Sequence, residues 1–176
     1  MSVRFCLGML SLIFVFSSCN QPDKTIKESL YVSIDLHIYK NDTIQLFYID
    51  ETDNSYTESL SIKQFVEGKN ELQTLRYKLP IGVKPKNIRI DLGERSNYHD
   101  SIQINNISFS YRDLVLDGNN GKYKEWFDFN QNIYWGTDTL VYKLKVESNF
   151  YDPQLNGNKV LNSKLIKLFP PHIYER

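Results

Sequence analysis

Leu30-Tyr31-Val32-Ser33-Ile34-Asp35-Leu36-His37-Ile38 is the stretch that decides the fold. Apolar side chains occupy every second position of this run, and polar or amphipathic side chains occupy the positions between them. Because successive side chains of a strand point to opposite faces, the pattern predicts a β-strand with one face buried. A turn at Asn41-Asp42 follows, and the same alternation resumes at Ile44, Leu46 and Tyr48, which predicts a second strand.

The rest of the chain continues as short strands separated by turn-forming residues. We expect further strands over 60–65, 72–79, 87–92, 101–111 and 140–146, and a final apolar run at 165–169. About nine strands without intervening amphipathic helices predict an all-β, antiparallel β-sandwich of the jelly-roll type, formed by residues 30–176 as a single domain. A closed barrel is the alternative, but it would need longer and more regular hairpins than this sequence offers.

The longest predicted strand changes phase in its middle. Ile102 and Ile104 set one alternation, whereas Ile107, Phe109 and Tyr111 set the other. A shift of one residue would turn half of the apolar side chains toward solvent unless an extra residue is accommodated. We therefore predict a β-bulge or break at Asn105-Asn106.

The first eighteen residues are typical of a bacterial lipoprotein signal peptide. Arg4 precedes an apolar stretch over 7–16, which is too short to span a bilayer, and Ser17-Ser18 lies directly before Cys19. The run 16–19 resembles the lipobox, with Phe16 where Leu is usual, so we expect Cys19 to carry lipid, including palmitate. The alternative is an ordinary signal peptide with an incidental Cys19.

The lipobox resemblance implies a location and a domain plan. Residues 1–18 would be removed, 19–29 would form a flexible tether, and the folded domain would be held at the membrane by the lipid on Cys19. Asn20-Gln21-Pro22-Asp23 shows no clear inner-membrane retention signal, so we expect the outer membrane, with a periplasmic or surface-facing domain.

Charge and cysteine content exclude several classes of function. The chain has 21 Lys and Arg residues against 21 Asp and Glu residues, and loss of Arg4 with the leader leaves a net charge of −1. This balance gives no electrostatic case for binding nucleic acid. Cys6 lies in the leader and Cys19 would be acylated, so no disulfide or cysteine-ligated metal is expected in the folded part, and no cofactor is predicted.

Four segments occur in an order that is similar to a known class of domain. They are Asp42–Tyr48, Leu79-Pro80, Ile88–Gly93 and Ile102–Ile107. This order resembles the galactose-binding-like, carbohydrate-binding-module-type β-sandwiches of bacterial envelope and glycan-handling proteins. The resemblance implies a binding role, with ligands at the loops of one end or on a concave sheet face.

Within the third of these segments, the residues themselves carry three expectations. Arg89 alternates with Ile88 and Ile90, so it should face away from the core, exposed or paired. Gly93 should adopt a positive φ at the end of the strand, and the Asp91 carboxylate should cap backbone N–H groups.

Aromatic residues suggest where a sugar could bind. Tyr123, Trp126, Tyr134 and Trp135 lie near the polar stretch Asp128–Asn132, a composition suited to stacking on a pyranose and orienting its hydroxyls. The alternative is that both tryptophans fill the core, where aromatic side chains are common.

Other patterns carry weaker hypotheses. Asp50–Asn54 is rich in oxygen donors and could bind calcium, although a solvated loop explains it better. Asp42-Thr43-Ile44, Asp100-Ser101-Ile102 and Asp138-Thr139-Leu140 resemble O-glycosylation acceptors. His99-Asp100-Ser101 has the residue types of a catalytic triad, but neighbouring strand residues point to opposite faces.

Without a nucleophile elbow or a phosphate-binding loop, we expect no enzyme activity. The expected function is a lipid-anchored, non-catalytic envelope module that binds glycan. The alternative is a structural or assembly lipoprotein that docks onto a larger envelope protein complex through exposed strand edges.

Overall fold

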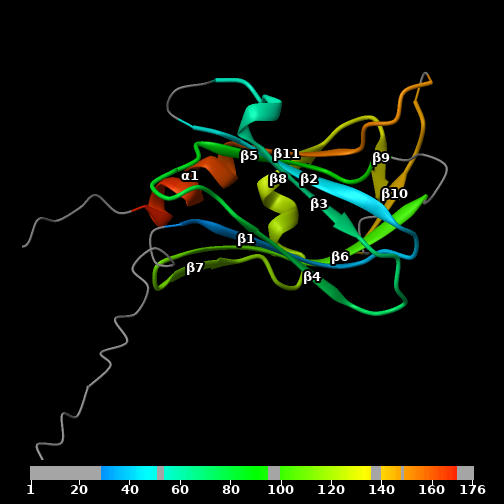
Figure 1. The fold of residues 1–176 in the computed structure, drawn as a ribbon, viewed down its shortest axis with the longest axis horizontal. Coiled ribbons are helices and arrows are strands. Elements are labelled where there is room, and N and C mark those ends of the chain that lie inside the picture. Colours follow the sequence, from blue (N-terminus) through cyan, green and yellow to red (C-terminus); the bar gives the residue numbers. More distant parts are fainter. Residues whose placement is uncertain (1–28, 51–53, 95–99, 136–139, 148, 170–176) are drawn as a thin grey trace, which may run out of the picture.

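The alternating segments form two antiparallel sheets that face each other (Figure 1). A computed structural model describes residues 29–50, 54–94, 100–135, 140–147 and 149–169. The described strands are β1 (Tyr31–His37), β2 (Asp42–Ile49), β3 (Ser61–Val66), β4 (Gln73–Lys78), β5 (Asn87–Asp91), β6 (Ser101–Tyr111), β7 (Leu114–Asp117), β8 (Phe127–Phe129), β9 (Ile133–Trp135), β10 (Val141–Leu144) and β11 (Gln154–Gly157). Two 3-10 helices, η2 (Glu58–Leu60) and η3 (Lys122–Trp126), and one α-helix, α1 (Lys159–Leu168), complete the described elements.

The strand order confirms the predicted all-β sandwich. Sheet A has the order β4-β1-β6-β10-β9, with β7 also paired to β6, and sheet B has the order β3-β2-β5-β11-β8. All of the described pairings between named strands are antiparallel. Within the described ranges, none of the helices has the length and apolar character needed to cross a membrane.

The core is built from the alternating apolar residues of β1 and β2, together with those of the other strands. Val32, Ile34 and Leu36 of β1 are fully buried, and Ile44 and Leu46 of β2 in the opposite sheet are buried as well. Burying one such side chain contributes about 1.5–3 kcal/mol relative to leaving it in water. The two inner faces therefore supply the main stabilisation of a domain whose described part has no cysteine.

The predicted bulge in β6 is confirmed. Asp35 pairs with Asn106, but the next residue of β1, Leu36, pairs with Ile104, so Asn105 is the extra residue on β6. Ile104 and Ile107 are both fully buried, although their spacing does not fit a regular strand. The bulge is what keeps both halves of β6 turned toward the core.

The helix α1 is not among the predicted elements, because its residues 165–168 are predicted only as part of a final apolar run. Its buried residues Leu161, Leu165 and Leu168 are spaced by four and three positions, which places them on one helical face. The Asn158 side chain caps the helix by accepting a hydrogen bond from the backbone N–H of Val160 at 2.9 Å. The helix covers one end of the gap between the sheets (Figure 1).

Candidate functional site

The structure divides the four predicted aromatic residues between the core and the surface. The 3-10 helix η3 lies between the two sheets (Figure 1), and there the Tyr123 hydroxyl donates a hydrogen bond to the carbonyl of Ile104 at 2.7 Å. Trp126 is 2% exposed, and its ring centroid lies 6.1 Å from that of Phe109. Tyr134 is 66% exposed. Tyr123 and Trp126 thus serve the core and present no ring face to a sugar.

Several predicted positions lie outside what the structure describes. They are Cys19 with the whole leader and most of the tether, residues 51–53 of the proposed calcium loop, His99, Thr139 and the side chain of Trp135, of which only the backbone in β9 is described. Among the described residues, no group of three or more His, Cys, Asp or Glu side chains is arranged to hold a metal ion. Thr43 and Ser101, the other two O-glycosylation candidates, are half-buried within β2 and β6.

The polar residues of sheet B gather on its outer face. Strand register places Gln45 of β2 opposite both Lys63 of β3 and Asp91 of β5, and places Asp91 opposite Gln154 of β11. These residues occupy the positions that alternate with core residues, so their side chains lie on the face turned away from sheet A. Four strands thus present a continuous polar row.

The central feature of this face is an ion pair between Arg89 and Asp91, two residues apart on β5. The Arg89 Nε donates to Asp91 Oδ1 at 2.8 Å, and the second guanidinium nitrogen donates to Oδ2 at 2.9 Å. The guanidinium carbon also lies 4.1 Å from the ring centroid of Phe47 and 5.2 Å from that of Tyr56. The expectation that Arg89 is exposed or paired is confirmed, and the pair is held in one geometry by aromatic rings.

Burial decides the protonation behaviour of this pair. The two side chains are only 19% and 13% exposed. Burial is the largest effect on Asp91 and raises its pKa to about 6. The Arg89 guanidinium lowers this pKa, and the Asp152 and Glu58 carboxylates raise it. The Asp91 carboxylate accepts hydrogen bonds from Arg89, and among the described residues the backbone N–H of Glu94, just after β5, donates to Asp42 Oδ1 at 2.9 Å and not to Asp91, so the predicted capping role of Asp91 is wrong there.

A depression of about 360 Å³ lies over the ion pair. On one side its wall is formed by Glu58, Lys63 and Glu94, with the Lys63 ammonium 2.9 Å from a Glu94 carboxylate oxygen. On the other side its wall is formed by Phe150, Tyr151 and Asp152. We call this depression, with Gln45, Phe47, Arg89 and Asp91 as its floor, the sheet B depression.

Hydrogen bonds between neighbouring side chains fix the polar groups in and beside the sheet B depression. The Gln45 amide donates to Glu58 at 3.0 Å and to Ser61 at 2.9 Å, and the Gln154 amide donates to Asp152. Four carboxylates face two cations here, so the lining has a net charge of −2 when all groups are ionised. An arrangement of carboxylates and amides beside a half-exposed aromatic rim suits hydroxyl groups, which both donate and accept hydrogen bonds.

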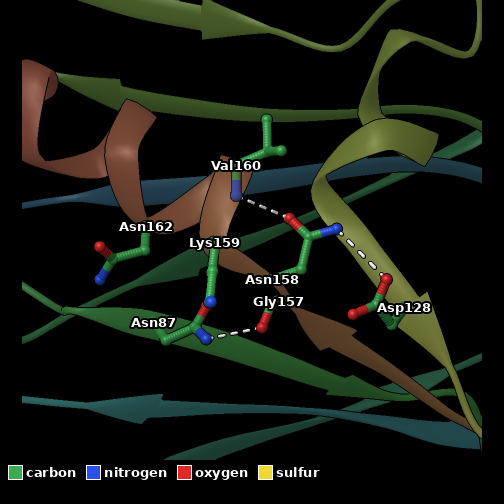
Figure 2. Close-up of a pocket in the computed structure, with 7 residues that line it drawn as sticks. All are labelled: Asn87, Asp128, Gly157, Asn158, Lys159, Val160 and Asn162. Atoms are coloured by element: carbon green, nitrogen blue, oxygen red, sulfur yellow. Dashed lines mark hydrogen bonds between the residues drawn. The ribbon is translucent and has the colours of Figure 1, made fainter.

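A second, larger depression of about 630 Å³ lies at the start of α1 (Figure 2). Its polar groups hold the backbone. The Asn87 amide donates to the carbonyl of Gly157 at 2.6 Å, Asn158 caps α1 and contacts Asp128, and the Asn162 amide donates to the carbonyl of Lys86 at 2.6 Å. Because these bonds attach the helix to β5 and β8, we assign this depression a structural role.

Local sequence patterns predict only part of the sheet B depression. The prediction that Gly93 has a positive φ is confirmed at 118°, and this residue lies two positions after the end of β5 and lines the depression. Phe150–Asp152 and Glu58 could not be assigned to the same place from spacing, because they come from segments about ninety residues apart. No protein family, curated protein or solved structure matches the chain.

Proposed function

We propose that this protein is a lipid-anchored, non-catalytic binding module of the bacterial cell envelope that recognises glycan at the sheet B depression. The observation that carries the proposal is the Arg89–Asp91 pair on the floor of the depression. Its charged groups are held rigidly by Phe47 and Tyr56, so a ligand meets a preformed surface and little side-chain entropy is lost. The β-sandwich fold agrees with the resemblance to galactose-binding-like modules.

The charge of the depression narrows the class of glycan. A lining with a net charge of −2 repels uronic acids and other acidic sugars, and it accepts neutral sugars or amino sugars. The exposed ring of Phe150 offers a face for stacking on the apolar side of a pyranose. We therefore expect neutral or amino-sugar oligosaccharides to bind best.

The carboxylates of the depression support binding over catalysis. Both oxygens of Asp91 accept hydrogen bonds from Arg89, and these bonds compete with transfer of a proton to a glycosidic oxygen. The Asp152 carboxylate accepts a hydrogen bond from Gln154.

A glycan titration of the purified protein tests the proposal. Calorimetry with a panel of neutral, amino-sugar and acidic envelope oligosaccharides should show binding that Arg89→Met weakens at least about tenfold, equivalent to about 1.4 kcal/mol. Lys143→Ala on the exposed part of β10 in sheet A is the matched control and should leave the affinity unchanged. No heat across the panel would refute the glycan assignment, and appearance of cleaved products would refute the non-catalytic one.

The anchor is tested separately by metabolic labelling with a fatty-acid analogue. Label should appear on the wild-type protein and disappear in Cys19→Ala. Label that survives this substitution would show that Cys19 is not the acylated residue.

A second candidate function, docking onto a larger envelope protein, is supported by the end of the sandwich that lies away from α1. Tyr39, Phe65, Leu72 and Tyr134 are large apolar residues that are exposed there. Aromatic residues of this kind are enriched at protein interfaces. Crosslinking in intact membranes separates the two candidates, because a stoichiometric protein partner would favour docking.

A further inference from the structure

Three segments that are far apart in the sequence meet at one end of the sandwich. They are the β4–β5 connection (79–86), the turn between β6 and β7 with the start of β7 (111–115), and α1 with the residue after it (159–169). The Asn162 amide donates to the carbonyl of Lys86, and the ring of Phe169 packs edge-on against Tyr111 at 4.9 Å. We call these segments the α1 end, and Figure 1 shows them beside the start of β1.

The α1 end combines exposed aliphatic residues with cations. Ile81, Leu114, Val115, Val160 and Ile166 are exposed there. Its three segments also contain six cations and a single acid, Asp113, which gives a net charge of +5; the cations are Lys84, Lys86, Arg112, Lys159, Lys164 and Lys167. Since the whole chain has a net charge of zero, the rest of the protein carries −5. The three segments of the α1 end are thus strongly cationic as a set.

Aliphatic and cationic side chains are neighbours within this surface. One depression of about 200 Å³ beside α1 is lined by Leu114, Val115 and Leu116 together with Lys164 and Lys167. Another, of about 460 Å³ on the other flank of the helix, is lined by residues that include Lys84, Lys86 and Ile166. Aliphatic groups surrounded by cations are the composition that binds at the interface of an anionic bilayer.

The start of the described chain lies at the same end. The backbone N–H of Leu79 donates to the carbonyl of Leu30 at 2.9 Å, and Tyr31 pairs with both Lys78 and Ser110. Cys19 is ten residues before Ser29, and ten residues span at most about 35 Å when fully extended. A lipid on Cys19 would therefore be joined to the domain at the α1 end, where the described chain begins, and would place this end within about 35 Å of the bilayer.

We infer that the α1 end is a binding surface for an anionic phospholipid bilayer. The cations attract lipid phosphates, and Leu114, Val115 and Ile166 enter the interfacial layer between the headgroups. This inference rests on the lipid anchor of the proposed function, and it adds an orientation to it. The domain would stand on its α1 end, with the strand ends that carry Asp91 and Gly93 directed away from the membrane.

Lysine footprinting of the acylated protein tests this orientation. The mature protein is purified from membranes and reconstituted into vesicles of phosphatidylcholine, with or without phosphatidylglycerol, and a pulse of acetylating reagent is read out by mass spectrometry. In the anionic vesicles Lys86, Lys159 and Lys167 should react at least about fivefold more slowly than in the neutral ones. Lys40 and Lys143, exposed residues at the far end, should react equally in both and are the internal control.

Charge-reversed variants provide the matched comparison. The triple variant Lys86→Glu/Arg112→Glu/Lys167→Glu should abolish the slower reaction of the remaining Lys159. The triple variant Lys40→Glu/Lys69→Glu/Lys143→Glu makes the same change in net charge at the far end. In this variant Lys159 should still react more slowly in the anionic vesicles. Raising the salt concentration to about 1 M, where the screening length falls to about 3 Å, should remove the effect in the wild type.

Each other outcome would overturn the inference in a recognisable way. Equal reaction of Lys86 in both kinds of vesicle would refute binding of the α1 end to the bilayer while leaving the lipid anchor intact. Protection that depends on protein density and not on lipid charge would assign the surface to a second copy of the chain. An intact mass without acyl groups would refute the lipid anchor itself, and with it the inferred binding of the α1 end to the bilayer.

Discussion

Ionisation of Asp91 should destabilise the folded protein, and the substitution Asp91→Asn isolates this effect. Burial raises the pKa of Asp91 from 3.8 to about 6, so the folded state binds a proton more tightly than the unfolded state does. Stability that depends on this proton is complete below about pH 3.8 and is lost as the pH rises through about 6. The direction is opposite to that of a carboxylate whose pKa is lowered by a salt bridge.

The size of the effect follows from the two pKa values. A difference of about two units corresponds to about 3 kcal/mol between the protonation states, of which about 2.5 kcal/mol falls between pH 4 and pH 7. Asparagine has the same shape as aspartate and does not titrate, so Asp91→Asn retains every other ionisable group as a common background. We expect the free energy of unfolding of the wild type, relative to Asp91→Asn, to fall by about 2–3 kcal/mol over this pH range.

Urea unfolding at four pH values between 4 and 7 measures this difference. Both proteins should give the same m-value, so that the midpoints report stability alone. Two curves of stability against pH that run parallel would refute the reasoning, since Asp91 would then titrate alike in the folded and unfolded states. A wild type that gains on the variant as the pH rises would show that the Arg89 pair outweighs the cost of burial.

Three further predictions concern the framework. Leu165→Ala should lower the free energy of unfolding by about 2–5 kcal/mol because it leaves a cavity under α1, whereas Ile166→Ala on the exposed face should cost less than about 0.5 kcal/mol, as measured by urea unfolding. Asn158→Ala should cost about 1 kcal/mol, seen as a lower Tm, because it removes the cap of α1, and Asn158→Asp should retain most of that stability. Gly118→Ala should cost about 3 kcal/mol by the same unfolding measurement, since its Cβ would lie 2.4 Å from the carbonyl oxygen of Ile107; an unchanged midpoint would contradict this close approach.

Period-two alternation was enough to predict β1 to β6, β10 and the bulge, whereas the short strands β7, β8, β9 and β11 were not individually predicted. In β6 the change of phase between Ile104 and Ile107 located an extra residue at Asn105 because only a bulge can keep both residues buried. Such inferences succeed because side-chain direction in a strand depends on the chain itself and on nothing distant.

The helix α1 and the residues of the sheet B depression could not be predicted from local patterns, because tertiary structure determines them. In α1, Val160 and Ile166 are exposed apolar residues, and they obscure the helical spacing of Leu161, Leu165 and Leu168. Composition allowed Trp126 either a sugar-binding surface or the core, and the position of η3 between the sheets (Figure 1) buries it. The site residues Gln45, Asp91 and Gln154 become neighbours only through strand register, which no local pattern encodes.

The cost of the Arg89–Asp91 pair is itself an argument for a binding role. A largely buried ion pair whose carboxylate has a raised pKa contributes less to stability than apolar side chains of the same volume would. The outer face of sheet B does not need charge for folding, because the core on its inner face is complete, with Ile44, Leu46 and Ile90 fully buried. Groups that oppose folding and are nevertheless held in a fixed geometry are concentrated at sites that bind or react. The same depression is therefore expected to lower the stability of the fold at neutral pH and to offer a ligand polar groups that are already fixed in position.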